Sequence, residues 1–298
     1  MTGLGAPTPD ALARACPEAA PWLRVLGRAR EAARRGTSRA QATLDQARAP
    51  DAPVLAGAVI EVDGSALARL AAALGAAAGR GVAAAGATWR RLDAVALLEA
   101  ALTADGDRVT ALAAGVGVEA GALGAIGQAL AMSVLWPVAA SLEDRIPPGW
   151  TRGSCPFCGA WPTLAEERGL ERTRRLRCAR CGAAWPGLPL QCPYCGTTDH
   201  TRLGSLRLEA ALETRRVDLC DACRGYLKTV VTLGALDRAL VPLADLATVE
   251  LDLAALARGY ARPPEPDRPL AVRVRPRPPR GARRWWSLTA DGWRGGGP

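Results

Sequence analysis

The residues of this chain best suited to chemistry are cysteines arranged in pairs. Eight of the nine cysteines form four Cys-x-x-Cys pairs: Cys155 and Cys158, Cys178 and Cys181, Cys192 and Cys195, and Cys220 and Cys223. Two intervening residues allow one turn to direct both sulfurs at one ion, and two such pairs complete a tetrahedral four-thiolate site. The spacing therefore predicts two four-cysteine metal sites.

The residues that follow the pairs support a metal-binding turn. Glycine comes directly after three pairs, as Gly159, Gly182 and Gly196, and Arg224 follows the fourth. Glycine adopts a positive φ at little cost, which lets backbone N–H groups fold back toward the thiolates. Four pairs with three such glycines are typical of metal knuckles.

Other uses of cysteine fit the chain less well. A disulfide framework needs an oxidising compartment, whereas Arg14 and Arg24 interrupt any apolar core of a signal peptide within residues 1–26. Thioredoxin-like redox pairs normally occur singly, after a strand and at the start of a helix. Cys16 has no partner nearby and is predicted to be an ordinary buried or half-buried thiol.

Four pairs can be combined into two sites in three ways. Consecutive pairing closes loops of 19 and 24 intervening residues. It is favoured because short loops cost less closure entropy and because each module can then fold alone. Interleaved pairing stays open, since spacing does not exclude it.

The elements that position these cysteines change in character along the chain. Apolar residues recur at helical spacing before Pro147, whereas short segments such as 173–177 and 203–208 alternate with the cysteine pairs after Trp150. Such small hairpins bury little apolar surface, so metal must hold them together. We predict an α+β fold that begins with a mainly helical domain over 1–149. Two small rubredoxin-like or zinc-ribbon four-cysteine modules follow over 150–232, and then a C-terminal helical segment over 233–262. The remaining residues, 263–298, are predicted to form a disordered Pro/Arg/Gly tail that is dispensable from residue 266.

One apolar segment has the length of a membrane span. Residues 121–142 contain no charged side chain, but they are mostly Ala and Gly and include Pro137. A buried helix is the better interpretation, and we expect a cytoplasmic protein without membrane insertion.

The formal net charge of +9 suggests a nucleic-acid-binding double zinc ribbon as an alternative function. Residues 262–298 hold nine Arg and three acidic residues, or +6, which leaves +3 for the rest of the chain. We therefore expect no nucleic-acid partner.

A divalent ion with four thiolates carries a formal charge of −2, and we interpret the basic residues near the pairs as neutralising it. These residues are Arg174, Arg175, Arg177, Arg180 and Arg224.

A third possible class is an enzyme, such as a thiol oxidoreductase. The sequence shows no carboxylate/histidine constellation, phosphate loop or nucleophile elbow, so no catalytic or cofactor-binding residue is predicted. His200 is the only histidine and lies five residues after Cys195. Eight cysteines already complete two sites, which favours a loop position for His200 over a ligand role.

The order of the motifs resembles the formate dehydrogenase accessory protein family, FdhE. The matching segments are Cys155-Pro156-Phe157-Cys158-Gly159-Ala160-Trp161-Pro162, the pairs at 178–181 and 192–195 with Trp185 between them, Cys220-Asp221-x-Cys223 followed by Tyr226-Leu227-Lys228, and the runs Asp245-Leu246-Ala247, Leu251-Asp252 and Gly259-Tyr260-Ala261-Arg262. The specific motifs cover about residues 155–262. The helical first half agrees with the family in length and texture only.

The resemblance implies a cytoplasmic maturation factor, or chaperone, that binds the catalytic subunit of a molybdenum-dependent respiratory formate dehydrogenase. It also implies that the eight paired cysteines hold two rubredoxin-type iron ions and that the chain turns over no formate itself. Tetrahedral thiolate sites accept iron and zinc alike, so the residues leave the metal open. They also leave the oligomeric state open.

Overall fold

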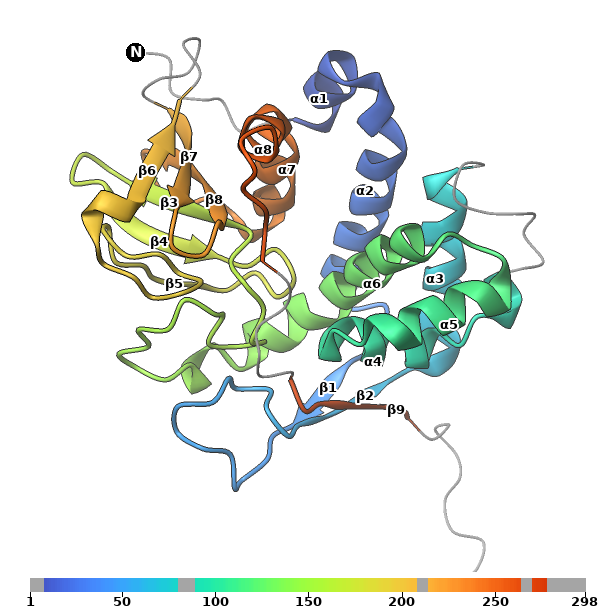
Figure 1. Ribbon diagram of the computed structural model, residues 1–298. Coiled ribbons are helices and arrows are strands. Elements are labelled where there is room, and N and C mark those ends of the chain that lie inside the picture. The colour runs from blue at the N-terminus through green and yellow to red at the C-terminus, as the bar shows by residue number, and fades with distance from the viewer. Residues whose placement is uncertain (1–7, 80–88, 208–213, 264–269, 278–298) are drawn as a thin grey trace, which may run out of the picture.

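The computed structural model describes residues 8–79, 89–207, 214–263 and 270–277, and it confirms the α+β fold (Figure 1). The α-helices are α1 (Pro9–Ala15), α2 (Ala20–Arg35), α3 (Gly64–Ala78), α4 (Ala94–Thr103), α5 (Gly106–Val116), α6 (Ala120–Ser141), α7 (Val241–Leu246) and α8 (Val249–Leu256). The strands are β1 (Gln41–Thr43), β2 (Val59–Val62), β3 (Leu164–Arg168), β4 (Thr173–Arg177), β5 (Ala184–Pro186), β6 (Leu203–Leu206), β7 (Arg215–Cys220), β8 (Tyr226–Thr232) and β9 (Arg273–Pro276).

Helix α6 forms the centre of the helical half. Its neighbours α2, α3, α4 and α5 all contact it, and its apolar side chains are buried on every side of the helix. A helix that is apolar all round requires partners all round. Among the described residues, α6 is the one helix long and apolar enough to cross a membrane, yet 72% of its most apolar stretch is buried inside the protein. This burial agrees with the prediction of a buried helix at residues 121–142.

Acidic side chains begin four consecutive helices. Asp63, Asp93, Asp105 and Glu119 precede α3, α4, α5 and α6, and each carboxylate accepts a hydrogen bond from a backbone N–H in the first turn. Such N-caps satisfy donors that have no partner within the helix, and each is worth about 1 kcal/mol. Short-range sequence therefore fixes where these helices start.

A small sheet of order β1-β2-β9 pairs strands of the N-terminal half with a strand more than 200 residues later in the chain. Strand β9 pairs in parallel with β2, so that Val59 lies opposite Arg273 and Val62 opposite Pro276. Val274 is buried, and its N–H donates to Glu99 Oε2 at 2.7 Å. The prediction of a disordered tail is therefore wrong for residues 270–277. Residues 264–269 and 278–298 of that predicted tail lie outside the described residues.

The two cysteine modules share one six-stranded sheet of order β5-β4-β3-β8-β7-β6. The first module supplies β3, β4 and β5, and the second supplies β6, β7 and β8. The parallel pair β3–β8 joins them, whereas every other pair in this sheet is antiparallel. This differs from the expectation that each module folds alone, because the central hydrogen bonds of the sheet run between modules.

The largest buried apolar cluster extends from the helices into the first module. It includes Leu97 of α4 and Leu135 of α6 together with Phe157, Trp185 and Leu227 of the cysteine region. Phe157 has no exposed surface, and Trp185 is 1% exposed. The first cysteine module is thus packed as part of the main core.

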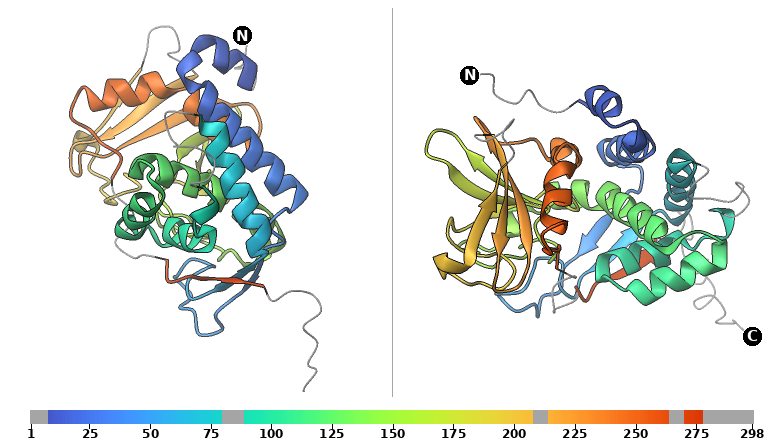
Figure 2. Two further views of the ribbon diagram at one scale, coloured as in Figure 1. Left: turned by 90° about the vertical axis from the view of Figure 1, so that its right-hand side faces the viewer. Right: turned by 45° about the horizontal axis from the view of Figure 1, so that its top comes forward.

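The predicted C-terminal helical segment over 233–262 contains two short α-helices, α7 and α8. Helix α7 ends at Leu246 and α8 begins at Val249, with the Thr248 hydroxyl donating back to the Ala244 carbonyl at 2.9 Å. Leu251 packs with buried residues of β7 and β8, and Leu243 of α7 packs against residues of α2. The two helices therefore lie between the six-stranded sheet and the N-terminal helices (Figure 2).

Candidate metal centre

All four cysteine pairs adopt the same backbone turn. The N–H of the first cysteine donates to the carbonyl five residues later at 2.8–3.0 Å in each pair. The residue after each pair has a positive φ, which is 72° at Gly159, 82° at Gly182, 75° at Gly196 and 59° at Arg224. The prediction that these glycines adopt a positive φ is confirmed. Arg224 completes the same turn in a conformation that side chains other than glycine seldom adopt.

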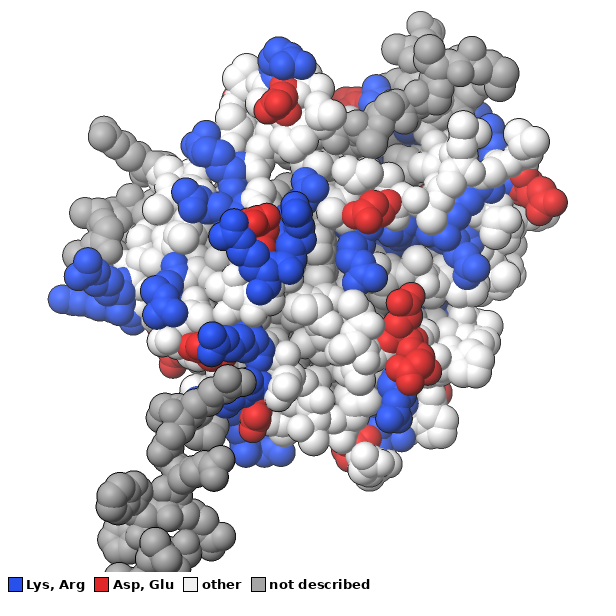
Figure 3. Space-filling view, turned by 180° about the vertical axis from the view of Figure 1, so that it is seen from behind, with Lys and Arg blue, Asp and Glu red and all other residues white. Residues whose placement is uncertain are grey.

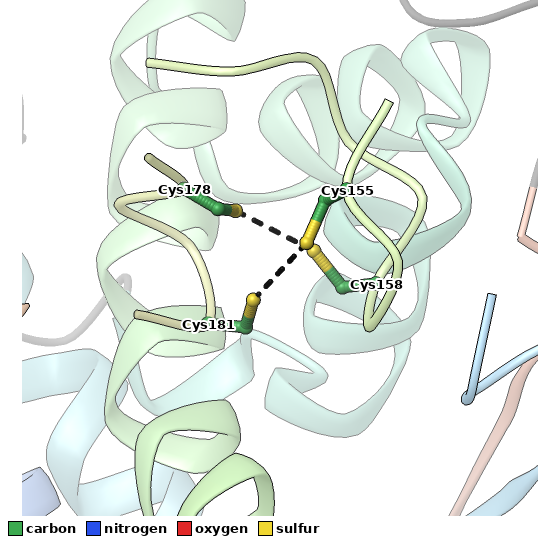
Figure 4. A group of neighbouring side chains, drawn as sticks. All are labelled: Cys155, Cys158, Cys178 and Cys181. Carbon is green, nitrogen blue, oxygen red and sulfur yellow. Dashed lines mark hydrogen bonds between the residues drawn. The ribbon is translucent and has the colours of Figure 1, made fainter. Parts of the chain in front are cut away.

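The first group consists of Cys155, Cys158, Cys178 and Cys181, whose sulfurs point toward one another (Figure 4). The Sγ atoms of Cys155 and Cys181 lie 3.5 Å apart, and those of Cys158 and Cys178 lie 3.6 Å apart. Four sulfurs at a zinc–sulfur distance of about 2.3 Å lie about 3.8 Å from one another in a tetrahedron. The first group therefore needs little adjustment to hold an ion.

The second group consists of Cys192, Cys195, Cys220 and Cys223. The Sγ atoms of Cys192 and Cys223 lie 3.7 Å apart, as do those of Cys195 and Cys220. Both groups combine consecutive pairs, which confirms the arrangement favoured by loop length. Neither Cys16 nor His200 belongs to these groups. Cys16 is half-buried, as predicted, and His200 is exposed in a short 3₁₀ helix, His200–Arg202.

Burial makes the first group unfavourable for free thiolates. Burial raises the pKa of the Cys155 and Cys181 thiols well above their ordinary value. Hydrogen bonds from Cys155 and Cys158 instead hold the pKa of Cys178 well below it. A bound cation supplies the positive charge that lets all four ligands ionise together. The chemistry of this donor set thus fits a divalent or trivalent metal ion.

The helical half fixes the first group in place. The Val54 N–H donates to the Pro156 carbonyl at 2.9 Å, and the Trp136 indole N–H of α6 donates to the Ala179 carbonyl at 3.0 Å. Pro156 and Ala179 lie between the two cysteines of their respective pairs. Both turns that carry the first group are therefore hydrogen-bonded to the helical half.

Several arginines expected to neutralise the metal sites pair with carboxylates instead. Arg174 donates to Asp218 at 2.8 Å, and Arg177 pairs with Glu166. Burial opposes ionisation of Glu166, but hydrogen bonds from Arg168, the backbone and Arg177 outweigh burial and lower its pKa. These buried ion pairs join strands of the sheet. They explain why basic residues occur here without a role in neutralising the thiolates.

A second polar network contains the residues of the downstream motifs. The Lys228 ammonium is fully buried and donates to Asp252 Oδ2 at 2.5 Å and to Asp245 Oδ1 at 2.9 Å. Arg262 donates to the same two carboxylates at 3.2 and 2.6 Å, and the Tyr226 hydroxyl donates to Asp252 at 2.8 Å. Two cations and two anions thereby hold α7 and α8 against β8.

A cleft of about 570 Å³ lies between the helical half, the cysteine turns and α7. Its apolar walls include Trp22 of α2, Trp161 and Tyr194. The rings of Trp161 and Tyr194 lie 5.2 Å apart in an edge-to-face arrangement. Asp245 and Arg262 line the same cleft. The network of Lys228, Asp245, Asp252 and Arg262 therefore contacts the sheet through Lys228 and lines the cleft through Asp245 and Arg262.

Spacing and motifs do not predict the roles of some of these residues. Glu166 lies in no recognised motif, and tertiary packing brings it to the ion pair with Arg177. Tyr194 lies inside a cysteine pair, but its place in the cleft wall also depends on tertiary packing. Lys228, Asp252 and Arg262 did carry a signal, because each lies in a motif of the family resemblance. In the structure, the three motifs supply the ion pairs that attach α7 and α8 to β8.

No family model matches this chain. Among curated proteins, it is 36% identical over 111 residues to the Protein FdhE homolog of Stutzerimonas stutzeri (strain A1501), which covers 36% of this chain and 35% of that relative. It is 30% identical over 141 residues to the Protein FdhE homolog of Haemophilus influenzae (strain ATCC 51907 / DSM 11121 / KW20 / Rd), which covers 44% of each chain. The chain resembles the FdhE proteins. This confirms the resemblance that the cysteine motifs indicate.

The fold agrees with a solved FdhE structure. The crystal structure of the FdhE protein from Pseudomonas aeruginosa matches with a TM-score of 0.53 and 23% identity, covering 90% of this chain and 97% of that one. At this identity the match shows a shared fold. The sequence matches to the curated FdhE homologues span less than half the length of each relative named above.

Proposed function

We propose that this protein is an accessory factor for the maturation of a respiratory formate dehydrogenase, and that it binds the catalytic subunit of that enzyme in the cytoplasm. The FdhE-like sequence and fold support this proposal. The observation that carries it is the pair of preassembled four-cysteine groups. They give the chain the means to bind two metal ions.

The proposed ligands are the four cysteines of each group, with one metal ion per group and two per chain. Iron is the proposed metal because of the family resemblance, and zinc fits the same thiolate geometry. A tetrathiolate iron ion can exchange one electron, whereas zinc has no redox chemistry at this site. In either case, the chain's own contribution is to hold four sulfurs about one point and to exclude water from the first group.

Nucleic-acid binding is the weaker alternative. Charged residues of both signs are interspersed on the face in Figure 3, with uncharged surface between them. Arg174, Arg177 and Arg216 of the six-stranded sheet all pair with carboxylates, which reduces the charge they can offer to phosphates. We therefore propose that the chain's partner is a protein.

The decisive experiment is genetic complementation. A host lacking its own copy of the accessory factor is supplied with this chain, and formate-dependent dye reduction is measured together with the amount of catalytic subunit. Replacing Cys192 and Cys195 by serine should abolish dye reduction while synthesis of the subunit continues, because the factor acts after translation. The matched control is Cys16→Ser, which removes a thiol outside both groups.

Affinity purification without air from the same cells tests the partner and the metal together. The expected result is co-purification of the catalytic subunit and two metal ions per chain, with the red colour of rubredoxin-type iron if iron is bound. Full activity of the Cys192/Cys195 variant would contradict the proposal. Recovery of nucleic acid in place of the subunit, with steep salt dependence, would favour the alternative.

A further inference from the structure

The two four-cysteine groups differ sharply in their access to solvent. Every cysteine of the first group is 0–1% exposed. In the second group Cys192 and Cys220 are buried, whereas Cys195 and Cys223 are exposed. A chelator must reach a sulfur or the ion to remove a metal, so exposed ligands make the second group the accessible one.

The turn built around Cys220 and Cys223 also holds the end of the C-terminal helical segment. The Arg224 guanidinium lies 3.9 Å from the centre of the Tyr260 ring and donates to Asp221 at 3.0 Å and to the Arg258 carbonyl at 2.7 Å. The Tyr260 hydroxyl donates to the same Asp221 carboxylate at 2.5 Å. Asp221 and Arg224 both belong to the turn built around Cys220 and Cys223.

Backbone contacts continue this attachment. The Ala261 N–H donates to the Arg224 carbonyl at 2.9 Å, and Gly225 and Ala261 form an isolated parallel bridge. A Cβ on Gly225 would lie 2.8 Å from the Tyr194 ring and 3.1 Å from the Cys223 sulfur, so this backbone passes tightly between the metal turn and the cleft wall. Residues 258–262, the C-terminal arm, are thus hydrogen-bonded and stacked onto the second group's turn.

The arm leads directly into the cleft. Its last residue, Arg262, lines the cleft and donates to Asp245, which lines it as well. Tyr194 lies between Cys192 and Cys195 and forms another part of the wall. The same metal turns therefore position two sides of one cleft.

We propose that the second four-cysteine group is a metal-responsive latch. Its metal exchanges with solvent while the first group retains its own, and loss of the exchangeable ion frees the C-terminal arm from the Cys220–Cys223 turn. This inference rests on the proposed binding of one metal ion by each group.

Metal release tests the first part of the latch. The full-length chain is loaded with Zn²⁺, its content of two ions is verified, and an excess of the chromogenic chelator pyridylazoresorcinol is added. We expect two phases of one zinc each, with rates that differ by about tenfold or more. Cys223→Ser should remove the fast phase and leave the slow one. Release of both ions in one phase, or a fast phase that persists in Cys223→Ser, would overturn the proposal.

Hydrogen–deuterium exchange of the arm tests the second part. After the fast phase, peptides containing Ala261 should exchange faster, whereas α6 should remain as protected as before. Unchanged exchange of the arm after loss of one zinc would refute the latch.

Arg224→Gly separates metal binding from latching. Glycine occupies the equivalent position in the other three turns and accepts a positive φ, so this variant should keep two zinc ions and both release phases. It keeps the backbone bond from the Ala261 N–H to the carbonyl of residue 224 but lacks the stacking and the hydrogen bonds to Asp221 and Arg258, so its arm should exchange faster than that of the parent protein even when both are fully loaded. A protected arm in the loaded variant would refute the coupling. Failure of any variant to bind metal at all would instead count against the proposed function.

Discussion

Replacing the buried Lys228 by methionine should destabilise the protein strongly. The ammonium group has no exposed surface and contacts both Asp245 and Asp252. Together with Arg262, these side chains form a neutral group of two cations and two anions. Methionine retains most of the volume of the lysine stem but leaves one uncompensated negative charge.

The expected loss follows from the burial of the partners. Removing one member of a buried ion pair typically costs about 3–5 kcal/mol. Asp245 is 29% exposed and Asp252 is 18% exposed, and Arg262 still contacts both, so the remaining charges are partly solvated and partly paired. We therefore expect a loss near the lower end, about 3 kcal/mol in the free energy of unfolding.

Urea unfolding of the zinc-loaded chain, followed by circular dichroism and tryptophan fluorescence, measures this loss. The double variant Lys228→Met/Asp252→Asn restores neutrality and should recover part of the stability. A control at the exposed pair Arg35 and Glu31, Arg35→Met, should change stability very little. A loss below about 1 kcal/mol for Lys228→Met, or a double variant no better than the single one, would refute the charge argument.

Replacing Glu166 by glutamine should cost less stability as the pH falls. Its pKa is lowered from 4.5 on folding, so its stabilisation is complete above that value and is lost as the pH drops through the lower folded-state value. Urea midpoints of both proteins between about pH 6 and pH 3 should converge, and a constant gap would contradict this. Gly153→Ala should weaken zinc binding, because a Cβ there would lie 1.7 Å from the Pro193 carbonyl oxygen; unchanged chelator competition would argue otherwise. A chain ending after Pro263 lacks β9 and the buried residues Leu270, Val272 and Val274, and it should lose at least about 2 kcal/mol; an unchanged urea midpoint would show that these residues add little.

Local patterns predicted the parts of this structure that depend on neighbours in sequence. The Cys-x-x-Cys turns, with Gly159 and its equivalents at positive φ, are fixed by a few consecutive residues. Loop-closure entropy favoured the consecutive pairing that the structure shows, although spacing left interleaved pairing open. The uncharged segment at residues 121–142 likewise predicted a buried helix.

Contacts between distant segments set what the sequence left open. The pairing of β3 with β8 depends on residues more than 60 positions apart, and no alternation within either strand reveals its partner. Strand β9 was not predicted because its one aliphatic residue, Val274, lies between Arg273 and Arg275, and this Arg- and Pro-rich composition is typical of a disordered tail. The difference in exposure between Cys155 and Cys195 arises from the helical half packing on one group only, which spacing cannot encode.

The parallel pairing of β2 with β9 also constrains how the chain folds during synthesis. A ribosome delivers residues 59–62 long before residues 273–276, and all eight paired cysteines are translated in between. One edge of β2 therefore has no strand beside it for most of translation, and exposed edges invite pairing with other chains. The first sheet of the nascent chain is completed only after both cysteine groups have emerged. Both four-cysteine groups can therefore assemble before β2 gains its second neighbour.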